Sequence, residues 1–398
     1  MYKLLVISPS DIDDIRKKNT QHILETWDES FFGKVCFFFP FGKINHDEQN
    51  EVYRYLQLGW KTKSATLNRF RIVKLLRLIH LLGRIVLLPI RLKSDNYTMV
   101  RATDPYLSAL VGLYFSKILK VPLVVSIHAN YTKGAELGGN SFRLLGSRKL
   151  AIWLEGFIYH HCRLVLPIRE HLKQDIITNF ALPEENVRVF PHGISFSDFD
   201  ATPQMNVFDI FAIPKDKKII SFAGRFSQEN YIDDIVLIAK KVIHKRNDVV
   251  FLLAGGGSEW ERIKSKIEEY FQEGMIILPG FQNQSVVVNI RRQSFISLCL
   301  MGGYSLIEAC AAAKPVIAYA VEWHDELVID KETGFLIAEN DIEDAVEKII
   351  KLLDHPAKAE IMGINARDLA FSRHSLTHTS SIKRQIYREV LEVKPTGT

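Results

Sequence analysis

The stretch LCLMGGYSLIEACAAAKPVIAY, residues 298–319, joins an apolar run, a diglycine and a helical segment. The apolar run ends near Leu300 as a buried strand would, the diglycine forms a loop, and a helix begins at Tyr304. A second apolar run, PVIAYA at 315–320, follows the helix. This order predicts a parallel sheet, because parallel strands need a crossover connection that is usually a helix.

Apolar runs and helical patterns alternate along the rest of the chain in the same way. Helical patterns such as the one over 104–119 separate short runs rich in Val, Ile and Leu. Continuous apolar runs of this kind predict strands of a parallel sheet that is covered on both faces. The predicted strands lie at 4–7, 35–39, 97–102, 122–127, 163–168, 218–224, 249–255, 275–280, 295–300 and 315–320.

The alternation restarts after residues 191–204, and 398 residues suffice for two domains of roughly 150–200 residues each. We predict an α/β protein with two Rossmann-like, doubly wound domains, over 1–190 and 205–370, that face each other across a cleft. The remaining segment, 371–398, is predicted to form a helix that packs back toward the first domain. Ligands of such sheets bind at the carboxyl ends of the strands.

Composition excludes several classes of protein. With 47% hydrophobic and 24% charged residues, the chain is globular rather than disordered. No window reaches about 18 uncharged apolar residues, so no transmembrane helix is expected. The opening YKLLVIS lacks the charged lead and cleavage site of a signal peptide and indicates a first buried strand. Four scattered cysteines form no CxxC pair, which favours a reduced cytoplasmic protein without disulfides or a zinc site.

Charge is distributed unevenly along the chain. Residues 1–190 carry 27 Lys/Arg against 17 Asp/Glu, whereas residues 191–398 carry 24 against 29. From 52 to 94 there are ten Lys/Arg and no acids. A basic half indicates an anionic partner such as phosphates, nucleic acid or an anionic membrane, or else a merely soluble basic surface.

The segment LNRFRIVKLLRLIHLLGRIVLLPIRLK, residues 67–93, contains much of this excess. Its uncharged runs are too short to span a membrane. Gly83 and Pro89 are expected to bend or end a helix near its carboxyl end. On a helical wheel, cationic residues gather along one edge and leucine and isoleucine fill the rest. The helix is interpreted either as core-facing with a solvated basic edge, or as an interfacial helix docking on an anionic membrane through Arg69, Lys74, Arg77, Arg84 and Arg91.

The diglycine at 302–303 is a candidate anion site. Two glycines let phosphates approach the backbone, and the helix that follows offers unpaired N–H groups and its positive dipole end. Glu308, in the first turns of that helix, can accept two hydrogen bonds from a vicinal diol such as a ribose. Taken alone, a diglycine before a helix is more often a tight turn.

Two cationic or titratable residues follow predicted strands. Arg225 ends the strand of ISFAGRF and can grip a diphosphate bidentately, although a surface ion pair is an equally simple interpretation. His128 directly follows the strand of VVSIH, where it can contact a substrate, although a lone histidine is more often structural.

In this order and spacing, the motifs resemble the retaining glycosyltransferases of family 4, which have the GT-B fold. The resemblance runs along almost the entire chain, and its signature region with the downstream TGFLI is fairly specific. The segments that carry it are VVSIHAN (124–130), VRVFPHGISFSDF (187–199), AGRFSQEN (223–230), FLLAGGGSEWERIK (251–264), LPGFQN (278–283), MGGYSLIEACAAAKPVIA (301–318) and HDELVIDKETGFLI (324–337).

The resemblance implies a nucleotide-sugar donor, UDP- or GDP-linked, bound mainly by the second domain. It implies neither a cofactor nor a metal ion. His128 and Arg225 would be catalytic, beside the sugar and the phosphates, while Phe281 would contact the base and Glu308 the ribose. The leaving diphosphate would help to deprotonate the acceptor. The implied donor-binding residues are Gly224, Arg225, Phe281, Gly302, Gly303, Tyr304, Ser305 and Glu308.

The chain departs from the family pattern at several positions. Leu300 stands where the family has a glutamate, and Asn230 where it usually has a lysine. Trp323-His324-Asp325 replaces paired glycines and is expected to line the sugar pocket in place of that glutamate.

The first loop reads SPSDIDDIRKKN instead of carrying paired glycines. Arg16, Lys17 or Lys18 is expected to supply positive charge there. Asp11-Ile12-Asp13 spells DxD outside the context of a metal site.

We therefore predict a retaining, hexosyltransferase-type glycosyltransferase that acts on a sugar or lipid-linked acceptor in polysaccharide or glycolipid biosynthesis. We expect no nucleic-acid partner. The predicted location is cytoplasmic, with the protein peripheral on the inner face of the membrane. The alternative is a catalytically degenerate nucleotide-sugar-binding or partner subunit, and a sugar-nucleotide epimerase is a weaker third interpretation.

Overall fold

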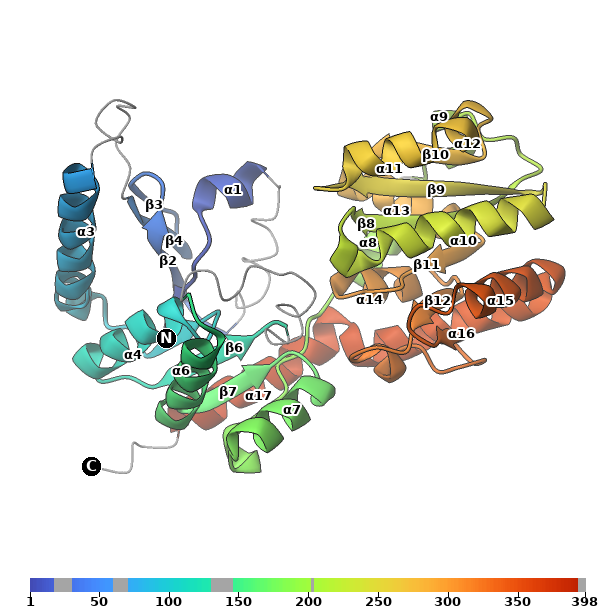
Figure 1. Cartoon of the computed structure of the whole chain (residues 1–398). Helices are drawn as coiled ribbons and strands as arrows, with labels where there is room; N and C mark the ends of the chain where they lie inside the picture. The colour runs from blue at the N-terminus through green and yellow to red at the C-terminus, as the bar shows by residue number, and fades with distance from the viewer. Residues whose placement is uncertain (18–30, 60–70, 130–145, 202–203, 393–398) are drawn as a thin grey trace. The chain divides into compact units, whose positions relative to one another are not determined.

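The computed structural model describes residues 1–17, 31–59, 71–129, 146–201 and 204–392 (Figure 1). The chain divides into two compact units. Unit 1 contains Met1–Ala135, Asn140–Pro191 and Ser380–Thr398, and unit 2 contains His192–Thr379. Each unit is an α/β domain built on its own sheet.

Unit 1 is built on a seven-stranded sheet of order β3-β4-β2-β1-β5-β6-β7. Its described pairings are parallel except that between β3 and β4. Only residues 50–52 join these two strands, too few for a crossover, so they pair antiparallel. The strands are β1 (Lys3–Ile7), β2 (Lys34–Gly42), β3 (His46–Gln49), β4 (Tyr53–Gly59), β5 (Met99–Ala102), β6 (Leu123–Ile127) and β7 (Leu164–Pro167).

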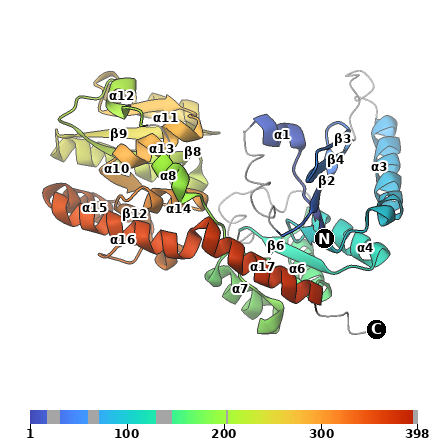
Figure 2. The same cartoon turned by 180° about the vertical axis from the view of Figure 1, so that it is seen from behind.

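Helices cover both faces of this sheet because successive strand residues point to opposite sides. Leu5 and Ile7 of β1 pack with α3 (Arg71–Leu92), α4 (Leu107–Leu119), α6 (Arg148–His161) and α7 (Glu170–Phe180). Leu4 and Val6 pack on the other face with α1 (Ile12–Lys17) and the carboxyl-terminal part of α17 (Leu376–Glu392). Figure 2 shows α17 from behind, with α7 beside it. A hydrophobic core therefore lies on each side of the sheet.

Gly83 and Pro89 were expected to bend or end helix α3, and the expectation that they end it is wrong. The helix runs through Gly83 and Pro89 and ends at Leu92, so neither residue ends it. Its buried side chains, Leu81, Ile85 and Leu92, join the core that covers one face of the sheet. Pro89 lies in the last turn, where its missing N–H removes one intrahelical hydrogen bond. Packing against the sheet thus keeps the chain helical beyond Gly83 and Pro89, two residues that disfavour helix.

Unit 2 is built on a six-stranded sheet of order β10-β9-β8-β11-β12-β13, and all its pairings among described residues are parallel. The prediction of two α/β domains with parallel sheets is confirmed. The strands are β8 (Lys218–Arg225), β9 (Val249–Gly256), β10 (Ile276–Gly280), β11 (Ile296–Leu298), β12 (Val316–Tyr319) and β13 (Gly334–Ile337). The helices are α8 (Phe196–Ala201), α9 (Val207–Ile210), α10 (Ile232–Lys245), α11 (Trp260–Lys266), α12 (Glu268–Gln272), α13 (Gln284–Gln293), α14 (Tyr304–Ala311), α15 (Ile342–Asp354) and α16 (Pro356–His374).

The strand order of unit 2 reverses between β8 and β11. From β8 the chain moves to β9 and β10 on one side, and from β11 to β12 and β13 on the other. Open α/β sheets bind ligands outside the carboxyl ends of the strands at such a switch point. Gly224 and Arg225 end β8, and Gly302 and Gly303 follow β11. The topology therefore brings two of the predicted motifs to the switch point of one sheet.

Candidate functional site

The turn between β11 and α14 requires a glycine and leaves a helix start open. A Cβ atom added at Gly302 would lie 2.4 Å from Cys299 Sγ and 2.7 Å from Leu306 Cβ. Gly303 is exposed and immediately precedes α14, and no described side chain caps this helix. The first N–H groups of α14 are therefore available to an anion, at the positive end of the helix dipole.

The side chains of Trp323 and His324 hydrogen-bond to the backbone of this turn. Gly302 N–H donates to His324 Nε2 at 3.0 Å, and Trp323 Nε1 donates to Gly302 O at 2.9 Å. The other ring nitrogen, His324 Nδ1, lies 2.8 Å from Tyr319 O and donates to it in the tautomer that these partners favour. Both side chains are buried, whereas Asp325 is exposed. The expectation that Trp323 and His324 line a sugar pocket is therefore wrong, because they support the glycine turn instead.

Glu308 on α14 is a buried carboxylate with two donors from α13. Gln284 Nε2 donates to its Oε1 at 2.8 Å, and Arg291 Nη2 donates to its Oε2 at 3.2 Å. The buried guanidinium of Arg291 compensates the charge of the buried carboxylate. Each carboxylate oxygen can accept more than one hydrogen bond, so both remain usable by a ligand.

Arg291 also ties Glu308 to the end of β8. Its Nη2 lies 3.4 Å from Ala223 O, one residue before Gly224. Sequence reasoning missed both Arg291 and Gln284. They are seven residues apart on α13, and this two-turn spacing places two polar side chains on the same face of a helix. That spacing was the available signal.

Arg225 extends from the end of β8 into solvent. Its side chain is 71% exposed, and its Nη1 lies 3.8 Å from Glu229 Oε2. An exposed ion pair of this length contributes little to stability, so the guanidinium is available to a ligand. Asn230 Nδ2 donates to Arg225 O at 2.8 Å. Asn230, which stands where the family usually has a lysine, therefore stabilises the backbone at Arg225.

Phe281 and the helix residues complete the predicted donor set in unit 2. Phe281 is 80% exposed and follows Gly280, whose φ of +73° favours glycine. A large exposed aromatic ring at this end of the sheet offers a stacking surface. Tyr304 is half-buried, and burial raises the pKa of its phenol. Ser305 Oγ lies 3.7 Å from Cys299 Sγ.

Leu300 occupies the position at which the family has a glutamate. Its side chain is fully buried and belongs to the core formed with Phe222 and Leu298. It therefore contributes packing, and it presents no polar group to a ligand.

His128 follows β6 in unit 1 and is surrounded by positive charge. Burial, together with the cations Arg101, Lys383 and Arg169, lowers the pKa of the imidazole to about 4. His128 is therefore neutral near pH 7, able to donate from one ring nitrogen and accept at the other. Its contact with a donor sugar stays a prediction.

Charged residues of the first loop pair with other residues of unit 1. Arg16 pairs with Glu48 at 2.5 Å, and Lys18 lies outside the described residues. Asp11 Oδ2 accepts the Lys43 N–H at 2.7 Å, and Asp13 lies 3.3 Å from His46 Nε2. Arg16 is therefore engaged within unit 1. Within the described ranges, no group of three or more His, Cys, Asp or Glu residues could hold a metal ion.

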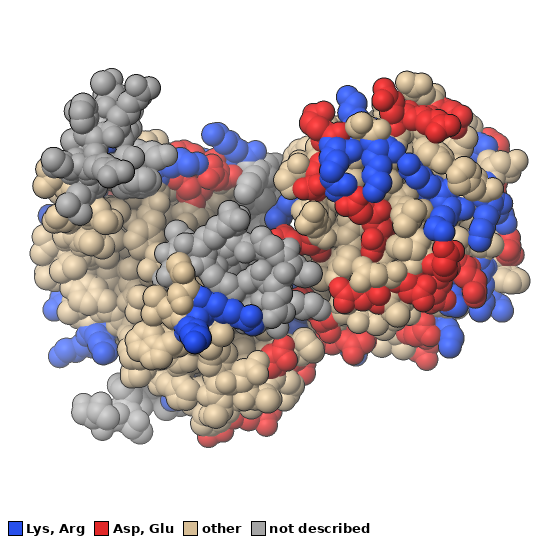
Figure 3. Space-filling model, in the orientation of Figure 1, with Lys and Arg blue, Asp and Glu red and all other residues tan. Residues whose placement is uncertain are grey.

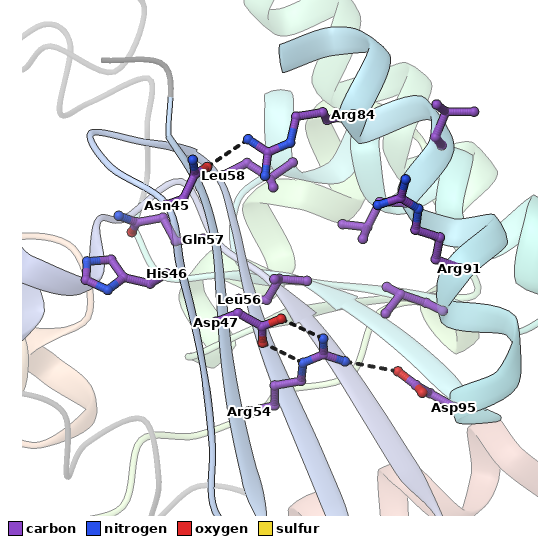
Figure 4. A pocket seen from close by; sticks show the side chains of 13 residues that line it. Asn45, His46, Asp47, Arg54, Leu56, Gln57, Leu58, Arg84, Arg91 and Asp95 are labelled. Carbon is purple, nitrogen blue, oxygen red and sulfur yellow. Dashed lines mark hydrogen bonds and ion pairs between the residues drawn. The ribbon is translucent and has the colours of Figure 1, made fainter. Parts of the chain in front are cut away.

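A cavity of about 490 Å³ lies between α3 and β4, and sequence reasoning did not predict it (Figure 4). Arg54 pairs with Asp47 at 2.9 Å and with Asp95 at 3.3 Å. Leucines of α3 and β4 form its apolar part, and arginines of α3 extend toward it. The lining residues are Asn45, His46, Asp47, Arg54, Leu56, Gln57, Leu58, Arg84, Leu87, Leu88, Arg91, Leu92 and Asp95.

Comparison with known proteins identifies related sequences and folds. The family models described as "Glycosyl transferases group 1" and "Glycosyltransferase Family 4" match residues 204–369 and 43–198. Alpha-D-kanosaminyltransferase of Streptomyces kanamyceticus is 23% identical over 294 residues, 71% of this chain and 74% of that relative.

Two solved structures cover nearly all of the chain. Sucrose-phosphate synthase from Thermosynechococcus elongatus has a TM-score of 0.78 at 17% identity, over 99% of this chain and 100% of that one. HepE of Anabaena, solved in complex with UDP-glucose, has a TM-score of 0.70 at 13% identity over the same shares. At these identities, the likeness shows a shared fold.

Proposed function

Because this chain belongs to the GT-B glycosyltransferases of the group 1 and family 4 type, we propose that it is a retaining hexosyltransferase. In this proposal the enzyme moves a sugar from a UDP- or GDP-linked donor to an acceptor hydroxyl. The observation that carries the proposal is the buried carboxylate of Glu308, held by Arg291 and Gln284 beside the open start of α14.

The ribose of the donor is assigned to Glu308. Two vicinal hydroxyls can donate to the two carboxylate oxygens, whose direction is fixed by the donors from α13. Phe281 would stack on the base. The UDP-glucose complex of HepE, which has the same fold, supports a nucleotide sugar as the donor.

The diphosphate is assigned to the backbone of Gly303, Tyr304 and Ser305 and to the side chain of Arg225. The N–H groups and helix dipole provide fixed partial positive charge, and the exposed guanidinium adds a bidentate donor. Charge that develops on the leaving diphosphate would thus be stabilised by groups already in place.

The transfer step breaks the bond between the anomeric carbon and the phosphate oxygen, and the electron pair leaves with the diphosphate. A new bond forms between the anomeric carbon and the acceptor oxygen on the same face, which retains the configuration. The proton of the acceptor hydroxyl moves to the leaving diphosphate. No resident cofactor takes part in this proposal, and neutral His128 would contact the sugar from unit 1.

The acceptor is proposed to be a sugar or lipid-linked glycan of polysaccharide or glycolipid biosynthesis. The exposed apolar surface of α3 supports a lipid-linked acceptor over a nucleic acid, whereas the basic charge of the first half suits either.

The alternative of a degenerate binding subunit is not favoured. It rested on Leu300 and Asn230, and both residues have local structural roles that leave the Glu308 and Arg225 sites intact.

The proposal is tested by a panel of UDP- and GDP-sugars with candidate acceptors, measuring release of the nucleoside diphosphate. Arg225→Ala should lower turnover about 10²–10³-fold, because it removes a preorganised donor to the leaving group. Lys215→Ala is the matched control, since Lys215 is an exposed cation before the amino end of β8.

Proton NMR of the product reports the anomeric configuration. An inverted product would refute retention, and full activity in Arg225→Ala would refute the assigned role of that guanidinium. Nucleotide binding without turnover of any donor would favour the binding subunit.

A further inference from the structure

Helix α3 presents two different apolar sides. Leu81, Ile85 and Leu92 are buried against the sheet of unit 1. A second group of apolar side chains on the same helix is between 48% and 60% exposed. At 100° per residue, all of this group except Leu78 fall in an arc of about 140°. The group, here called the α3 apolar face, is Leu76, Leu78, Ile79, Leu82, Val86, Leu87 and Ile90.

An exposed face of this size needs a partner. A surface helix normally carries polar residues opposite its buried side, and scattered single apolar residues would need no explanation. A contiguous apolar patch marks an interaction site. Figure 3 shows largely uncharged surface over α3 and α4, whereas the visible surface of unit 2 mixes acidic and basic groups.

The edge of this face is basic. Arg77, Arg84 and Arg91 recur every seven residues and lie within about 40° of one another around the helix. Arg84 Nη1 donates to Asn45 Oδ1, a neutral partner, at 2.8 Å (Figure 4). In the part of the chain that the structure describes, neither Arg84 nor Arg91 pairs with an acid.

Nearby acids do not neutralise Arg84 or Arg91. The two acids that line the adjacent cavity, Asp47 and Asp95, both pair with Arg54. The sequence has no acidic residue between 52 and 94.

We propose that α3 docks unit 1 on the surface of an anionic phospholipid bilayer. The helix lies in the plane of the membrane, with the α3 apolar face at the acyl boundary and the arginines at the level of the phosphates. No described helix is long and apolar enough to cross a bilayer, so the contact is peripheral.

Exposed apolar residues also occur on the neighbouring helices. Leu110 on α4 and Ile152 and Trp153 on α6 are exposed, and α4 contacts both α3 and α6. Tryptophan favours the boundary between lipid and water.

Charge selects the bilayer over a second copy of the chain. A two-fold dimer would pair the same patch on both subunits, so it would bring two arginine edges and no acid of α3 to the interface. Like charges placed opposite each other oppose association. An anionic membrane meets the apolar face and the basic edge at the same time. The proposal depends on the surface of unit 1 alone and not on the transferase activity.

Vesicle flotation of the full chain tests the docking. Vesicles of phosphatidylcholine with phosphatidylglycerol should bind the protein at least tenfold more tightly than phosphatidylcholine alone. Raising the ionic strength from about 0.05 M to about 0.5 M should weaken binding, since screening shortens the reach of surface charges.

Three variants separate the contributions of the two parts of the surface. Leu82→Ser, Val86→Ser and Ile90→Ser together should reduce binding at least tenfold, as should Arg77→Glu, Arg84→Glu and Arg91→Glu together. The matched control changes Leu237, Ile361 and Ile364, which are exposed apolar residues of helices in unit 2, to serine. This control should bind like the wild type.

Three outcomes would overturn the proposal. They are absence of binding to anionic vesicles at low salt, equal binding by both α3 variants and the wild type, and a dimer that the serine variant dissolves without any vesicle binding. Circular dichroism and thermal unfolding of each variant check that the substitutions leave the fold intact. Turnover of a soluble acceptor should be unchanged in the α3 variants, so a negative vesicle result would not weaken the proposed function.

Discussion

At the scale of single residues, a buried pair of opposite charges fixes the geometry of the candidate donor site. Glu308 and Arg291 are buried and compensate each other, while Gln284 directs the carboxylate. The sequence predicted Glu308 as a site residue, because a carboxylate after a diglycine is a recognisable arrangement, but it did not predict Arg291. The partner of a buried charge lies on another helix, and only tertiary packing brings the two together.

His128 gives a prediction at the same scale. Its folded-state pKa of about 4 lies below the ordinary 6.5, so the unfolded chain binds a proton first as the pH falls. The free energy of unfolding should therefore have its full value above about pH 6.5 and should decrease as the pH falls toward 4.

Urea unfolding at pH 7.5 and pH 5.0 measures this effect. His128→Gln should lose less stability between these two values than the wild type does. His160→Gln, at an exposed histidine of α6, is the control and should behave like the wild type. An unchanged difference in His128→Gln would show that the imidazole does not titrate as described.

At the scale of elements, glycines let the ends of β8 and β9 approach. Gly255 has a φ of +142°, and a Cβ atom there would lie 1.8 Å from Gly224 O. The neighbouring Gly256 has nothing within 4 Å of an added Cβ atom. The sequence GGG alone does not distinguish these positions, whereas the register of Gly224 opposite Gly255 does.

We expect Gly255→Ala to destabilise unit 2 by more than about 1 kcal/mol, because it combines a strained φ with a backbone clash. It should also weaken nucleotide binding, since Gly224 and Arg225 would shift. Gly256→Ala is the matched control and should remain close to the wild type. Thermal unfolding and calorimetric titration with UDP and GDP compare the two variants. Equal stability in both would contradict the role of Gly255.

At the scale of the whole molecule, α17 links the two units through the chain. Its residues from Ser380 onward belong to unit 1, whereas Leu376 to Thr379 belong to unit 2. Tyr387 is buried in the core of unit 1, and its Oη accepts a hydrogen bond from Arg101 Nη1 at 2.5 Å. The carboxyl-terminal part of α17 is therefore part of the first domain's core.

Tyr387→Ala should destabilise unit 1 by about 3–5 kcal/mol, the range for deleting a buried aromatic ring. Nucleotide binding should survive at temperatures where unit 1 remains folded, because the proposed donor residues other than His128 lie in unit 2. Arg388→Ala, at the exposed neighbouring position, is the control. Calorimetry with and without nucleotide separates the transitions, and a loss confined to unit 2 would contradict this prediction.

The sequence by itself determined most of the alternation of strands and helices and the two α/β domains with largely parallel sheets, and it predicted Arg225, Gly302 and Glu308 as site residues. Those features follow from local patterns, because a continuous apolar run and a diglycine before a helix carry their meaning within a few residues. The strands β3, β4 and β13 were not predicted, and the edge strand β3 gave no signal because its sequence, HDEQ, has no apolar residue to bury.

Only the tertiary structure decided which side chains face solvent. On the helical wheel α3 is apolar on nearly every side, so its sequence could not tell the side packed on the sheet from the side left exposed. The role of Trp323 and His324 likewise could not be predicted from sequence, because both side chains hydrogen-bond to Gly302, more than 20 residues away. Whether a side chain is buried depends on neighbours that are distant in sequence. The residue pattern could therefore predict helices and strands, but only the fold shows which side of each is buried.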